Sequence, residues 1–98
     1  MSAPTKRVIE MVKEYLRYYL GDIRRFKRKE FTQACYSKWA AQEILRRLIV
    51  DDETPPLIVL EEFRDKMDKY SLINQETTEI FSVAKDTAEY FIDLILSE

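Results

Sequence analysis

Residues 81–95 read FSVAKDTAEYFIDLI, and the spacing of their apolar side chains decides the fold class. Apolar residues recur there at steps of three and four, which is the period of an α-helix that buries one face. The stripe consists of Phe81, Ala84, Ala88, Phe91 and Ile95. We expect a helix over residues 75–96, with Asn74 as its N-cap and its alanines at the core, where they let a facing helix approach closely.

The helical period continues toward the N-terminus. The turn Thr54-Pro55-Pro56 predicts the start of a helix over residues 55–70, because proline suits the first helical position, where a missing N–H costs nothing. A further helix is predicted over residues 33–50, with Thr32 as its N-cap. Its apolar side chains are Cys35, Trp39, Ile44, Leu45, Leu48 and Ile49.

The N-terminal stretch predicts one long helix over residues 6–28. Its stripe, again at steps of three and four, is Ile9, Val12, Leu16, Tyr19, Ile23 and Phe26. Gly21 lies inside the stripe, and the alternative is a helix that ends there, with Asp22 capping a new one. We favour continuity, because the stripe keeps its phase beyond the glycine. The sequence therefore predicts an all-α, antiparallel four-helix bundle in which residues 1–98 form a single domain.

The composition excludes several classes of chemistry. The chain has no histidine, so Ser-His-Asp, Cys-His and histidine–metal sites cannot form within it. One cysteine allows no internal disulfide and no multi-cysteine zinc site, and Cys35 suits the core. One glycine rules out a Gly-rich phosphate loop. We therefore expect no catalytic residue, metal or cofactor. We also expect a cytoplasmic location, because the first ten residues hold no apolar signal segment and no apolar run is long enough to span a bilayer.

Carboxylates are the remaining candidate catalytic groups. The run Glu62-Phe63-Arg64-Asp65 is similar to the second half of the E-x-x-E and E-x-x-D pair of all-helical nucleotide pyrophosphohydrolases of the MazG type. That resemblance implies a Mg²⁺-dependent phosphohydrolase, but the first half is missing, because Glu10 and Glu14 are four apart. The acids then belong to solvated helix faces. A further resemblance is to short bacterial helical proteins, and it rests on residues 54–56, 62–68 and 81–88. It suggests no particular activity.

Charge is unevenly distributed along the chain. Residues 1–38 hold ten basic and four acidic side chains, whereas residues 39–98 hold six basic and fourteen acidic ones. The two halves can neutralise each other within one bundle, or pair between two copies or with a partner. A third alternative is nucleic acid, bound by a compact basic cluster. That cluster is Arg24, Arg25, Lys27, Arg28 and Lys29.

Tyrosines supply the candidate contact surface. Tyr18, Tyr36 and Tyr90 lie off the predicted apolar stripes, and tyrosine is enriched in interfaces because it buries a large ring while its hydroxyl stays wet. The sequence therefore predicts a small module that binds a protein partner or a second copy of itself as a homodimer, and does not bind membranes. The alternative is a nucleic-acid-associated regulator that uses the basic cluster.

Overall fold

The structure is a computed structural model that describes residues 3–73 and 78–97. The helices of these ranges are α1 (Ala3–Glu14), α2 (Arg28–Val50), α3 (Pro56–Ile73) and α4 (Thr78–Leu96). A π-helix, η1 (Tyr15–Leu20), continues α1, and a 3-10 turn, η2 (Ile23–Arg25), precedes α2. The all-helical bundle predicted from the sequence is confirmed.

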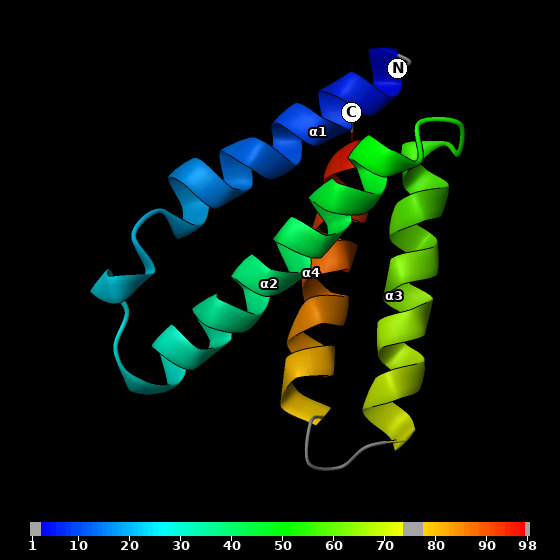
Figure 1. Ribbon diagram of the computed structural model, residues 1–98. Coiled ribbons are helices and arrows are strands. Elements are labelled where there is room, and N and C mark those ends of the chain that lie inside the picture. The colour runs from blue at the N-terminus through cyan, green and yellow to red at the C-terminus, as the bar shows by residue number, and fades with distance from the viewer. Residues whose placement is uncertain (1–2, 74–77, 98) are drawn as a thin grey trace.

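Figure 1 shows two antiparallel pairs, α1 with α2 and α3 with α4, and the pairs cross each other at an angle. Helix α4 contacts both α3 and α2, so it joins the two pairs. Four fully buried alanines lie on the two helices α2 and α4, namely Ala40, Ala41, Ala84 and Ala88. Small side chains at these positions let helix axes approach closely, as the sequence predicted for Ala84 and Ala88.

The prediction of a single helix over residues 6–28 is wrong beyond Leu20. The alternative prediction, a helix that ends at Gly21, is correct. Gly21 has φ 55° and ψ −133°, a conformation that a residue with a Cβ adopts only with strain. Asp22 then caps η2 by accepting a hydrogen bond from the Arg24 backbone N–H at 3.0 Å. Ile23 and Phe26 continue the apolar pattern of the sequence because they pack against the core. They do so although neither residue belongs to an α-helix.

The other helix boundaries in the structure differ by a few residues from those predicted from the sequence. Helix α2 begins at Arg28, not at residue 33, and the Thr32 hydroxyl lies within it, donating to the Arg28 carbonyl at 3.4 Å instead of capping an end. Helix α3 begins at Pro56, not at residue 55, and continues to Ile73, three residues past the predicted end. The predicted cap Asn74 and the predicted start of the last helix at residue 75 lie outside the described residues.

The π-helix η1 changes which side chains of the first helix face the core. The Gly21 N–H donates to the Leu16 carbonyl at 3.2 Å, an i to i+5 bond that widens the turn. The wider turn brings Leu20, 3% exposed, into the core and carries Tyr19 out to 61% exposure. Tyr19 was predicted to be buried, and that prediction is wrong for this reason.

Candidate interaction surface

A shallow groove lies where η1, α2 and α4 meet. Its volume is about 260 Å³. The helix η1 supplies two tyrosines, α2 supplies two polar residues, and α4 supplies one face. We call this site the tyrosine groove, and its lining residues are Tyr15, Tyr19, Gln33, Ser37, Val83, Asp86, Thr87 and Tyr90.

Three tyrosine rings pack together along the groove. Tyr15 stacks on Tyr19 with 4.9 Å between ring centres, and Tyr90 lies 5.4 Å from Tyr15 and 5.9 Å from Tyr19. Tyr15 also meets the buried ring of Phe91 edge to face at 5.0 Å. Tyr15 is only 9% exposed, whereas Tyr19 and Tyr90 are 61% and 41% exposed. One buried ring thus ties two exposed rings to the core, which holds their positions.

Hydroxyl groups form the floor of the groove. The buried Thr87 hydroxyl donates to the Val83 carbonyl at 2.8 Å, and its oxygen lies 3.4 Å from the Ser37 hydroxyl oxygen. Burial raises the pKa of Tyr15 above its usual 10.0, although the Ser37 and Thr87 hydroxyls act in the opposite direction. Because the neutral phenol is favoured, Tyr15 carries no charge in the groove at neutral pH.

The structure separates the three tyrosines singled out from the sequence. Tyr90 lines the groove, but Tyr18 and Tyr36 are not among its lining residues. Tyr18 is 73% exposed, and the Arg17 guanidinium lies 5.7 Å from its ring centre. Tyr36 is half-buried on α2. Tyr15 and Tyr19 line the groove instead. Tyr19 had been assigned to the apolar stripe, and the i, i+4 spacing of the two tyrosines was the available signal.

The basic cluster lies on the connection between η1 and α2 and on the first residues of α2. Arg24 forms an ion pair with Asp22 at 2.8 Å. The Arg25 guanidinium donates to the Tyr19 carbonyl at 2.8 Å and lies 4.5 Å from the Phe26 ring centre. The other three side chains are exposed and form no ion pair with any described residue; they are Lys27, Arg28 and Lys29.

The carboxylates of the E-x-x-D run do not converge. Glu62 and Asp65 are exposed on α3, and Asp65 pairs with its neighbour Arg64 at 3.1 Å. Across residues 3–73 and 78–97, no group of three or more acidic or cysteine side chains is arranged to hold a metal ion. Cys35, assigned to the core from the sequence, is half-buried.

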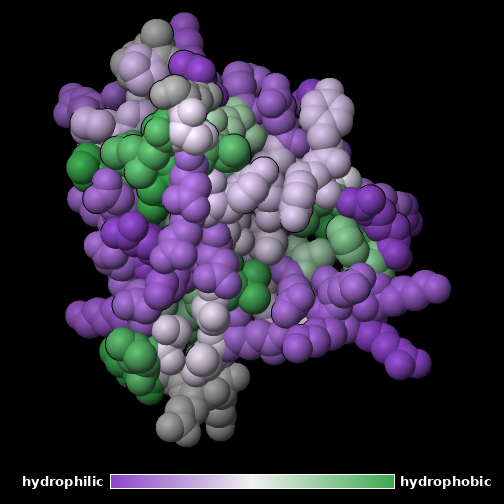
Figure 2. All heavy atoms as spheres, turned by 180° about the vertical axis from the view of Figure 1, so that it is seen from behind, coloured by the Kyte–Doolittle hydropathy of each residue, from purple (hydrophilic) through white to green (hydrophobic). Residues whose placement is uncertain are grey.

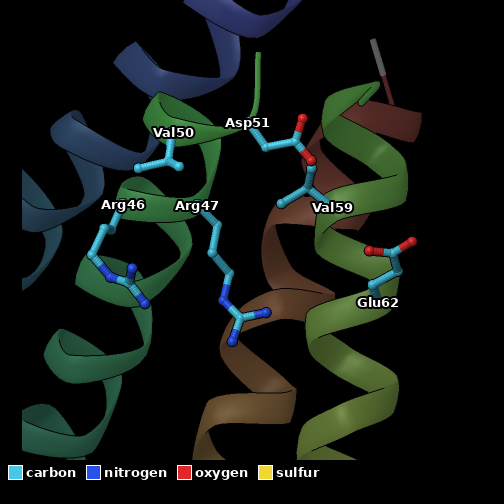
Figure 3. Close-up of a pocket in the computed structure, with 6 residues that line it drawn as sticks. All are labelled: Arg46, Arg47, Val50, Asp51, Val59 and Glu62. Atoms are coloured by element: carbon cyan, nitrogen blue, oxygen red, sulfur yellow. The ribbon is translucent and has the colours of Figure 1, made fainter. Parts of the chain in front are cut away.

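A second, smaller hollow of about 150 Å³ lies between α2 and α3 (Figure 3). Arg47 extends into it from α2, Arg46 lines it along α2, and Glu62 lies on the α3 side. Arg46 pairs with Glu43 at 2.9 Å. The Arg47 guanidinium lies 5.3 Å from the Phe63 ring centre, and its buried Nε has no hydrogen-bond partner among the described residues. Because both signs of charge surround this hollow, it favours neither an anion nor a cation.

Exposed apolar side chains also occur elsewhere on the surface. Figure 2 shows hydrophobic side chains in separate groups toward the edges of one face, with hydrophilic side chains between and around them. The exposed apolar side chains of the molecule include Ile49 and Val50 at the end of α2, Leu72 and Ile73 at the end of α3, and Leu96. No described helix has both the length and the apolarity that crossing a bilayer requires.

Comparison with known proteins yields no relative from which a role could be carried over. The chain matches no family model, and neither a curated protein nor a solved structure is significantly similar to it.

Proposed function

We propose that this chain is a protein-interaction module whose contact surface is the tyrosine groove. The observation that carries the proposal is the pair of exposed rings, Tyr19 and Tyr90, fixed in place by the buried Tyr15. Rings held in this way lose little conformational freedom when a partner covers them, and tyrosine is among the residues that dominate binding energy at interfaces.

Site-specific photo-crosslinking tests this proposal. A photoreactive phenylalanine analogue is placed at Tyr19 or Tyr90, and in a control at Tyr70 on α3, which is 37% exposed and lies outside the groove. The chain is expressed in cells of its natural source and irradiated. We expect discrete protein adducts from Tyr19 and Tyr90 and none of the same mass from Tyr70. Absence of adducts from both groove positions would rule the proposal out.

The second candidate function is binding of nucleic acid through the basic cluster. The observation that favours it is the exposure of Lys27, Arg28 and Lys29, which pair with no acidic residue that the structure describes. They lie at the start of α2, where the positive end of the helix dipole adds to their charge. A gel shift with random duplex and single strands at two salt concentrations tests it. Binding at low salt that is abolished in Lys27→Glu/Lys29→Glu supports this function, and no binding at low salt excludes it.

A further inference from the structure

The basic cluster and the tyrosine groove form one continuous surface. Lys29 lies four residues before Gln33, which lies four before Ser37, so the three share one side of α2. Gln33 and Ser37 line the groove. On the other wall, Arg25 donates directly to the Tyr19 carbonyl at 2.8 Å. The basic cluster therefore adjoins one end of the groove.

The wall contributed by α4 carries the opposite charge. Val83, Asp86 and Tyr90 line the groove at steps of three and four residues, and the next residue on this face is Asp93. Both aspartates are exposed, and neither forms an ion pair with a described residue. The nearby cation Lys85 is already paired with Asp68 on α3 at 3.1 Å. Asp86 and Asp93 are thus available to an external cation.

A surface with a cationic end, exposed aromatic rings and an anionic side is complementary to a second copy of itself. In a two-fold symmetric pair, each patch meets its counterpart on the other copy, so one copy's basic cluster can lie on the other's α4 face. A nucleic acid backbone fits the surface less well, because Asp86 and Asp93 would repel its phosphates. Tyrosine ring faces, in contrast, attract lysine and arginine.

We propose that the occupant of the tyrosine groove is a second copy of this chain, with the basic cluster of each copy paired to Asp86 and Asp93 of the other. This inference rests on the proposed function and names its partner. It accounts for the segregation of charge along the sequence, because each half of the chain meets the opposite half of its neighbour.

Reciprocal charge reversal tests the arrangement. One variant carries Lys27→Glu with Lys29→Glu, and the other carries Asp86→Lys with Asp93→Lys. Sedimentation of the unmodified chain over a micromolar concentration series should show a dimer. Each variant alone should associate about ten-fold more weakly or worse, because reversing Lys27 and Lys29, or Asp86 and Asp93, replaces attraction at those positions with repulsion. An equimolar mixture should dimerise again, since both contacts of the mixed pair are attractive.

Lys66→Glu with Lys69→Glu on α3 is the matched control for the lysine variant, because it makes the same change in net charge at exposed sites outside the groove. Helical circular dichroism verifies that each variant folds. A monomeric unmodified chain, or equal weakening by the control, or no rescue in the mixture overturns the inference. If photo-crosslinking then captures a different protein at Tyr19 or Tyr90, the interaction function stands and only the identity of the partner is refuted.

Discussion

Gly21 is the residue that ends the first helix and directs the chain into α2. Its φ of 55° with ψ −133° lies where an L residue with a Cβ is strained. A Cβ built on Gly21 would have the Arg17 carbonyl oxygen at 3.6 Å as its nearest contact, which is an ordinary van der Waals distance. The requirement for glycine therefore comes from the backbone conformation and not from crowding.

Gly21→Ala should lower the free energy of unfolding by about 1–3 kcal/mol, the usual cost of a residue held in a sparsely populated conformation. Urea denaturation followed by helical circular dichroism measures the loss. The control is Gln42→Ala at an exposed position of α2, which should stay within about 0.5 kcal/mol of the unmodified chain. Equal stability of the two variants would show that the chain does not need this conformation.

Asp22 should titrate well below an ordinary aspartate. The Arg24 side chain and backbone N–H hold the pKa of Asp22 at about 2, below the usual 3.8. Because the folded pKa is depressed, the stabilisation is complete above pH 3.8 and is lost as the pH falls toward 2. An NMR titration of the side-chain carboxyl measures the midpoint. In Arg24→Gln the midpoint should rise toward 3.8; an unchanged midpoint would contradict the assigned cause.

The π-helix η1 is the element whose effect could not be predicted from residue spacing. An α-helical period assigns Tyr19 to the core, but one widened turn reverses the positions of Tyr19 and Leu20. Backbone hydrogen bonding of this kind depends on how the end of the helix packs, and no residue pattern announces it. Tyr19 was therefore misassigned, whereas Tyr90, on the regular helix α4, is exposed as expected for a residue off the apolar stripe.

The packing of α4 in the core depends on small buried side chains and should not tolerate large ones at their positions. Ala88 is fully buried, so Ala88→Leu must displace neighbouring atoms and should lower the free energy of unfolding by about 1–3 kcal/mol. Thermal or urea denaturation measures this loss. Ser82→Leu, at an exposed position of the same helix, makes a similar gain in size without the clash. Comparable losses in both variants would mean that helix packing is not the cause.

Over the whole molecule, periodicity predicted the core best in regular helices. Ala84, Ala88 and Phe91 on α4 are fully buried, as their stripe indicated. The path of the chain between α1 and α2 was not predictable, because Ile23 and Phe26 reach the core from irregular backbone. The groove joins three segments that are distant in sequence. Individual residues of the groove could therefore be picked out from the sequence, but their grouping into one site could not.

Several ion pairs of the described residues join neighbours along the chain. Lys13–Glu10, Arg46–Glu43 and Arg64–Asp65 are three or fewer residues apart. Lys85–Asp68, which joins α4 to α3, leaves 35% and 47% of its side chains exposed. Pairs of this kind contribute about 0–1 kcal/mol each, so the buried apolar side chains hold the fold.

Salt should therefore affect association and folding differently. Between about 0.05 and 0.5 M NaCl, screening of exposed charges should change the free energy of unfolding of the dilute monomer by less than about 1 kcal/mol. The dimer dissociation constant should rise about ten-fold or more over the same range, because its contacts join opposite charges on separate copies. Urea denaturation and sedimentation at both salt concentrations measure the two quantities. A steep loss of folding stability with salt would instead show that the basic half is neutralised by the acidic half within one chain, which would leave no free charge for a second copy.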